Sequence, residues 1–218
     1  MAMLLYCVAE AARSPGSVPR GVRGSPVARR EHHGLTVFCS EAPSADAWTA
    51  IPVREGALQF YQVLEAVFRS TAIIPFRFPT VVAGTRELRE HLDARADLYA
   101  GRLERFRTRV QLEALVSYSG EDPRDRGFRG GAEYLRERQQ ILNATRRSAE
   151  RLRTAVAPLT SEWRSRTLGK RMQSFALVER QSVAEFKERA EKLSLPEGIN
   201  VRVSGPWPVT EFLDLSSK

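Results

Sequence analysis

The sequence predicts an α+β fold built as two successive domains, each of which combines strands with helices. Three observations support this prediction. Some segments place an apolar residue at every second position, as half-buried strands do. Others place one at every third or fourth position, as amphipathic helices do. In the second half these segments follow one another as strand, long helix, strand, helix and strand. The economical packing for this order is a split β-α-β arrangement, with the helices on one face of an antiparallel or mixed sheet.

Length and composition fit a globular chain with hydrophobic cores of its own. The 218 residues suffice for one large or two small domains, and we place the domains at 1–107 and 108–218. Hydrophobic residues make up 42% of the chain, yet no stretch approaches the ~18 consecutive apolar residues of a membrane-spanning helix. Two cysteines are too few for a disulfide framework, which favours a cytoplasmic address without a membrane partner.

The N-terminal domain is predicted to begin with two strands, at 4–9 and 35–39, separated by a long loop. Residues 10–34 are rich in Arg, Gly, Pro and Ser and show no periodicity, so we expect a flexible loop there. From Glu55 the period becomes helical. The residues expected on the buried face of this helix are Ala57, Phe60, Tyr61, Leu64, Val67 and Phe68.

Prolines and turn residues divide the rest of the chain into further elements. Pro75 and Pro79 limit 72–79 to a short extended segment, because proline lacks an amide donor and restricts the residue before it. A second helix is expected from Thr85 to Phe106. The elements expected in the C-terminal domain are strand 110–118, helix 131–157, strand 175–178, helix 183–193, strand 199–203 and an extended tail to 218.

The chain is strongly basic, with a formal net charge of +8, which raises the alternative of a nucleic-acid-associated protein. Only four of the 34 basic residues are lysine, so the excess is almost entirely arginine. In 124–153 nine arginines alternate with four carboxylates, a pattern more typical of a solvated, salt-bridged helix face than of a phosphate track. The other interpretation of this stretch is a surface for an acidic partner.

Motifs for catalysis or cofactor binding are missing, and we nominate no catalytic, cofactor-binding or metal-binding residue. The chain has no phosphate-binding loop, dinucleotide-binding glycine motif or nucleophile elbow. The glycines in 127–131 suit either an anion at a helix start or an ordinary loop-to-helix junction. A zinc site from Cys7, Cys39, His32 and His33 matches no known ligand spacing, and we expect the cysteines to be small buried hydrophobes.

The tail after the last predicted strand carries two aromatic residues, Trp207 and Phe212. Two prolines fix the backbone on either side of Trp207, and Phe212 follows shortly after, so the tail is expected to be rigid and extended. These two side chains either fold back over the sheet or the domain junction, or present an apolar surface to a partner. We nominate Trp207 and Phe212 as candidate partner-binding residues.

At this tail the chain resembles the gas vesicle GvpL/GvpF family, whose last strand runs into a Gly-Pro-x-Pro-x-x-Phe signature. The resemblance covers 3–9 and 35–213, leaves the loop 10–34 without a counterpart, and departs from the family where Pro79 and Thr80 replace its usual Gly-Thr. The residues that carry the resemblance are Gly205, Pro206, Pro208 and Phe212 of the signature, together with Leu5, Tyr6 and Val8, Pro75, Arg77 and Phe78, Gly131, Tyr134 and Leu135, and the stretch 175–178.

The resemblance implies a two-domain α+β accessory protein of gas vesicles, with a ferredoxin-like C-terminal domain and without enzymatic activity, cofactor or small-molecule substrate. It also implies binding to the small hydrophobic shell protein and to other gas vesicle accessory proteins. On this basis we expect a cytoplasmic protein that assists assembly at the gas vesicle, with a place as a minor vesicle component as a further implication. The alternatives are a basic nucleic-acid-associated protein and a small-molecule enzyme of ferredoxin-like fold, for which no residues can be nominated.

Overall fold

The structure, a computed structural model, describes residues 1–49, 52–120 and 131–213. The chain clusters into two compact units: residues 1–108 together with the segment that starts at Pro208, and residues 109–207. Each unit carries one four-stranded antiparallel sheet with helices, which confirms the α+β class. The tail, predicted as part of the C-terminal domain 108–218, instead groups with the first unit from Pro208 onward. No helix in the described ranges has the length and apolar character needed to cross a membrane.

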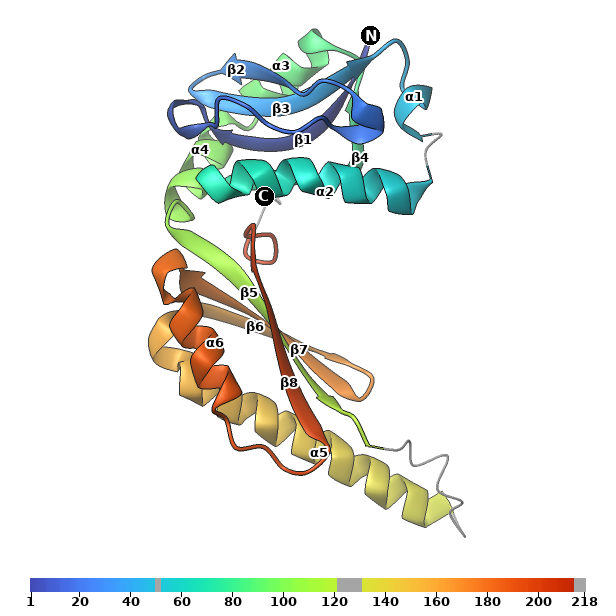
Figure 1. Cartoon of the computed structure of the whole chain (residues 1–218), viewed down its shortest axis with the longest axis vertical. Coiled ribbons are helices and arrows are strands. Elements are labelled where there is room, and N and C mark those ends of the chain that lie inside the picture. Colours follow the sequence, from blue (N-terminus) through green and yellow to red (C-terminus); the bar gives the residue numbers. More distant parts are fainter. Residues whose placement is uncertain (50–51, 121–130, 214–218) are drawn as a thin grey trace. The chain divides into compact units, whose positions relative to one another are not determined.

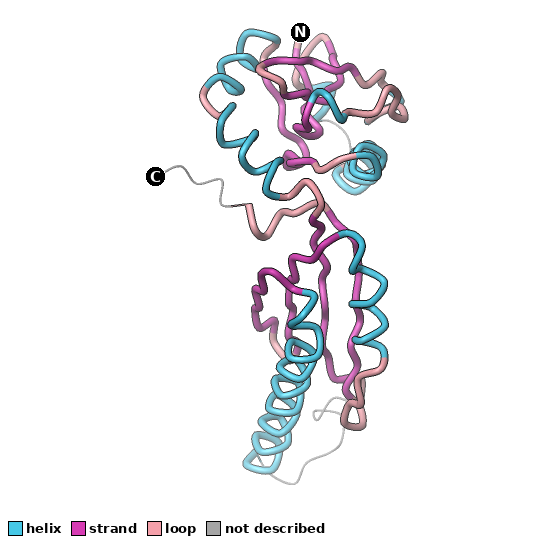
Figure 2. The backbone as a smooth tube through the Cα atoms, turned by 90° about the vertical axis from the view of Figure 1, so that its left-hand side faces the viewer, coloured by secondary structure: helices cyan, strands magenta, loops and turns pink. Residues whose placement is uncertain are grey.

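The first unit has three layers, with its sheet between helices (Figure 1, Figure 2). The strands follow the order β2-β3-β1-β4, and α2 covers one face of the sheet while α3 and α4 cover the other. The elements of this unit are β1 (Ala2–Glu10), β2 (Ala28–His32), β3 (Leu35–Ala42), α1 (Asp46–Thr49), α2 (Val53–Ser70), β4 (Ile73–Val82), α3 (Thr85–Asp93) and α4 (Ala96–Arg105).

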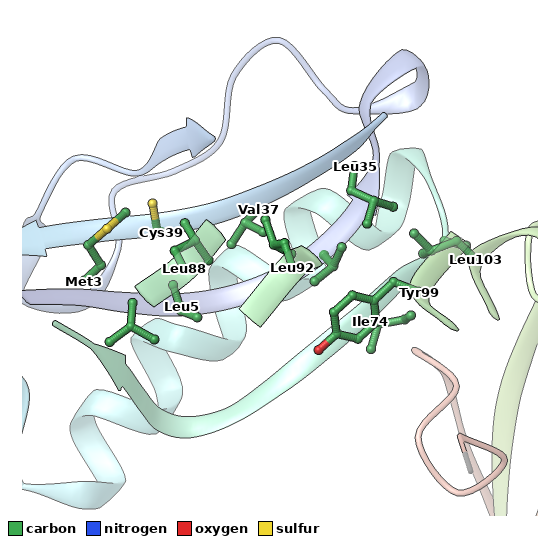
Figure 3. Close-up of a cluster of buried hydrophobic side chains, with 13 residues drawn as sticks. Met3, Leu5, Leu35, Val37, Cys39, Ile74, Leu88, Leu92, Tyr99 and Leu103 are labelled. Carbon is green, nitrogen blue, oxygen red and sulfur yellow. The ribbon is translucent and has the colours of Figure 1, made fainter. Parts of the chain in front are cut away.

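Strand β1 lies inside this sheet and is buried on both faces. Every residue from Ala2 to Ala9 is buried, which explains why the strand appears in the sequence as an unbroken apolar run rather than an alternation. Figure 3 shows the core cluster on one face, where Leu5 lies near Leu88 of α3. On the opposite face the ring of Tyr6 packs against Phe60 of α2, with the ring centroids 4.9 Å apart.

Strand β2 lies within 10–34, and the prediction of a loop is wrong for this part of the segment. β2 pairs with β3 in an antiparallel register that runs from Ala28 opposite Cys39 to His32 opposite Leu35. Its three central side chains are exposed. Because β2 is an edge strand, held by the backbone of β3 rather than by burial of its own side chains, no apolar alternation marks it in the sequence.

Two other elements of the first unit differ in length from the prediction. The short extended segment is a full strand, β4, which contains both Pro75 and Pro79. β4 is an edge strand, where a missing amide donor is tolerated on the open side. The helix predicted from Thr85 to Phe106 is divided into α3 and α4 by a break at residues 94–95.

The second unit packs two helices, α5 and α6, on one face of a sheet with the order β6-β7-β5-β8 (Figure 1, Figure 2). Strand β6 is missing from the predicted order, because its sequence is polar and it lies at the sheet edge, paired only with β7. The elements are β5 (Arg109–Tyr118), α5 (Gly131–Val156), β6 (Thr160–Leu168), β7 (Arg171–Glu179), α6 (Val183–Glu191) and β8 (Ile199–Trp207).

Helix α5 has nearly the predicted bounds, 131–157, but not all of its apolar side chains are buried. Ala149 and Val156 are buried, whereas Leu135 is 61% exposed. The beginning of α5 extends beyond the end of the sheet, so the first turns have no strand to cover (Figure 1). The buried side chains of α5 are Ile141, Thr145, Ser148, Ala149, Leu152 and Val156.

The Tyr6 hydroxyl joins three segments of the first unit, so we expect Tyr6→Phe to lower the free energy of unfolding by about 2 kcal/mol. The buried hydroxyl oxygen accepts from the Val22 amide at 3.0 Å and contacts Ser40 Oγ at 3.0 Å. Ser40 keeps a bond to the Pro26 carbonyl at 2.9 Å, but the buried Val22 amide loses the Tyr6 hydroxyl as its acceptor. Urea unfolding measures the effect. The control Tyr61→Phe, at a 37% exposed tyrosine, should change stability by less than about 0.5 kcal/mol.

Candidate functional site

Trp207 lies at the end of β8, an edge strand, and its side chain is half-buried. Its indole Nε1 donates to Ser204 Oγ at 3.3 Å, and its cross-strand partner is the buried Gln111. Gly205 has a φ of 109°, and a Cβ there would lie 3.0 Å from the Gln111 carbonyl oxygen. Glycine is therefore required for β8 to bring Trp207 this close to β5. The Lys187 ammonium of α6 donates to the Gly205 carbonyl at 2.7 Å and holds the same turn.

Phe212 lies in a different environment from Trp207. Its side chain is fully buried, at 0% exposure, and Val209 in the same segment is 3% exposed. The following residue, Leu213, packs against the core cluster of the first unit. Phe212 therefore covers core in the folded protein, whereas Trp207 is the more accessible member of the predicted pair.

Helix α2 carries exposed apolar side chains that the sequence patterns did not single out. Leu58 is 62% exposed and Tyr61 is 37% exposed. Three residues apart on one helix, they lie side by side on its outer face, here called the α2 surface. Tyr61 was predicted to be buried, and this is wrong, because the apolar stripe that faces the sheet is centred on Phe60, Val63 and Val67. Leu58, an apolar residue outside that stripe, is the signal that would have revealed the surface.

The two cysteines are buried and free, as predicted from their positions in strands. Burial raises the pKa of the Cys39 thiol to about 12 and raises that of Cys7 as well, so neither is a thiolate at neutral pH. They do not join His32 and His33 in a metal-binding group within the described part of the chain. The site of two cysteines and two histidines, which its spacing in the sequence already disfavoured, is not assembled among the described residues.

Many of the arginines pair with carboxylates in both units. Arg107 contacts Glu10 at 3.0 Å, and Arg109 contacts Glu179 at 3.0 Å. On α5, Arg153 lies 3.9 Å from Glu150, in keeping with a solvated, salt-bridged face. The first part of the arginine-rich stretch and the glycines at 127–130 lie outside the described residues, so the anion-binding interpretation is not tested.

An α+β protein with exposed apolar side chains on a helix and a half-buried tryptophan at a strand end belongs to a class in which contact with other proteins is the first function to consider. The model of the gas vesicle synthesis protein family GvpL/GvpF matches residues 2–214, and the chain belongs to this family. The match includes the tail signature and the opening strand, so the family resemblance predicted from the sequence is confirmed.

Two solved structures share the fold of the chain. The crystal structure of the gas vesicle protein GvpF from Anabaena sp. PCC7120 superposes with a TM-score of 0.76 at 16% identity, covering 99% of this chain and 97% of that one. The GvpF structure from Microcystis aeruginosa gives a TM-score of 0.74 at 15% identity, with 98% and 99% covered. Among curated protein sequences, none matches this chain.

Proposed function

We propose that this protein assists gas vesicle formation by binding the small hydrophobic shell protein before or during its polymerisation. Family membership supports a role in gas vesicle formation. The observation that supports a direct contact is the α2 surface, where Leu58 and Tyr61 are exposed beside the polar, exposed residues Gln62 and Glu65. An aggregation-prone apolar subunit is shielded by apolar area on an otherwise polar protein, and this surface offers such area.

Trp207 is the second proposed contact, and it lies in the second unit. Its half-buried ring combines a large apolar area with a fixed orientation, since Ser204 bonds the indole and Gly205 brings the strand close to β5. Aromatic side chains held in this way lose little conformational entropy on binding, which makes them frequent binding hot spots. Other gas vesicle accessory proteins are the proposed partners for this position.

The fold of the second unit supports the proposal of a ferredoxin-like domain. Its elements follow the order β5, α5, β6, β7, α6 and β8, and each helix connects two strands that are separated in the sheet by one other strand. This is the split β-α-β arrangement repeated twice. We further propose that the two units are the two domains of the protein, that it works in the cytoplasm at the gas vesicle, and that it has no enzymatic activity, in keeping with the missing catalytic motifs.

Co-expression with the shell protein tests the proposed function. We expect the soluble fraction of the shell protein to rise when this protein is present, because this protein would shield the exposed apolar surface of the shell-protein monomer. In the native host, deletion of the gene should reduce the yield of vesicles that float on centrifugation, and a plasmid copy should restore it. An unchanged soluble fraction together with an unchanged vesicle yield would contradict the proposal.

A further inference from the structure

A group of three potential metal ligands lies at one end of the first unit, formed by His32, His33 and Asp93. Asp93 Oδ1 is 2.5 Å from His32 Nε2 and 3.0 Å from His33 Nε2. The three ligand atoms all lie within 4.8 Å of one another. They come from two segments separated by about sixty residues, the β2–β3 hairpin and the end of α3.

The backbone of the hairpin explains how adjacent histidines point to one place. Neighbouring residues in a strand place their side chains on opposite faces, which is why adjacent histidines are poor ligands for one ion. Here His32 ends β2, while His33 and Gly34 form a two-residue loop with positive φ angles of 49° and 73°. Positive φ at both loop positions is the requirement of a type I′ hairpin turn. The turn brings the two imidazole rings together, with centroids 4.1 Å apart.

The position of Asp93 is unfavourable for a carboxylate unless a positive charge is nearby. It is the last residue of α3, where the helix dipole presents partial negative charge. The Nε2 atoms of His32 and His33 both lie within hydrogen-bond distance of its Oδ1 atom. A carboxylate placed against the dipole and beside two imidazole nitrogens is a common arrangement around a bound cation.

We propose that His32, His33 and Asp93 bind a divalent transition metal ion, with Zn²⁺ the best match to two nitrogen ligands and one oxygen ligand. A tetrahedral ion with bonds of ~2.1 Å separates its ligand atoms by roughly 3.4 Å, so small side-chain rotations bring these atoms to the required spacing. The side chains of His33 and Asp93 are 58% and 54% exposed, which leaves the remaining coordination position to water. The bound ion would fix the β2–β3 hairpin to α3, and this proposal is independent of the proposed function.

Calorimetric titration of the tag-free full chain with ZnCl₂ tests the site, with the Co²⁺ absorption spectrum as a second readout of tetrahedral coordination. We expect one ion per chain and a dissociation constant at least about tenfold weaker in Asp93→Asn and in His33→Ala. Asp97→Asn, an exposed aspartate at the start of α4, and His91→Gln, at a histidine outside the group, should leave the affinity unchanged.

Two outcomes would overturn the proposal. One is the absence of saturable binding at sub-millimolar Zn²⁺, which would leave the three residues as a hydrogen-bonded group that ties the hairpin to α3. The other is binding that Asp93→Asn does not weaken, which would place the ion elsewhere. Circular dichroism of each variant without metal separates loss of binding from loss of fold, because His33 and Asp93 are exposed and their substitution should leave the spectrum intact.

Discussion

Phe212→Ala is expected to lower the free energy of unfolding by about 3–5 kcal/mol, the largest effect of any substitution considered for this chain. The ring is fully buried, and the segment that carries it groups with the first unit, although the residues just before it, 109–207, form the second. Removing it creates a cavity in addition to the loss of apolar burial. Urea unfolding followed by circular dichroism measures the change. The tail would thus be a structural part of a domain that begins at the other end of the chain.

The neighbouring Glu211 supplies a control for Phe212→Ala. Glu211 is only half-buried, and Glu211→Gln should change stability by less than about 0.5 kcal/mol. If Phe212→Ala instead kept wild-type stability and lost binding to a gas vesicle protein, Phe212 would be a partner contact, as one interpretation of the sequence had it. If both variants were equally unstable, the effect would belong to the segment rather than to the ring.

The elements that the sequence predicted well are those whose own side chains enter a core. Helix α5 was predicted within about one residue of its observed end, because its apolar stripe packs on the sheet. Strand β7 was predicted from its buried residues 175–178, although it starts earlier, at Arg171. In such elements the free energy of burial and the local pattern agree, so the pattern is sufficient to predict them.

The strands that the sequence did not predict are edge strands with polar sequences. β2 and β6 each pair with a single neighbour, and most of their side chains are exposed. Their position depends on backbone hydrogen bonds to β3 and β7, which leave no mark on the side-chain pattern. Polar and charged side chains at a sheet edge also oppose pairing with other chains.

The candidate sites depend on tertiary structure even more strongly. Trp207 was nominated as a partner contact from its place between two prolines. The burial of Phe212 follows from the packing of the tail with the first unit, which no local pattern shows. The group of His32, His33 and Asp93 was missed for two reasons. Asp93 lies about sixty residues after the histidines, and the hairpin turn places the two adjacent histidine side chains on the same side instead of on opposite faces. Each of these features depends on which segments meet in the folded chain.

Leu58→Asp is expected to weaken binding of the shell protein by about 30-fold, which corresponds to about 2 kcal/mol of binding free energy. Leu58 is 62% exposed, so its replacement should hardly affect folding, while a charge at the centre of an apolar contact must be desolvated without a partner. Gln62→Asp introduces the same charge at an exposed polar position one turn further along α2, and it should weaken binding far less. Pull-down of co-expressed shell protein, with the unfolding curve of each variant, measures both effects. Equal losses in the two variants would show that net charge, rather than the apolar α2 surface, governs the contact, and no loss in either would place the contact elsewhere on the protein.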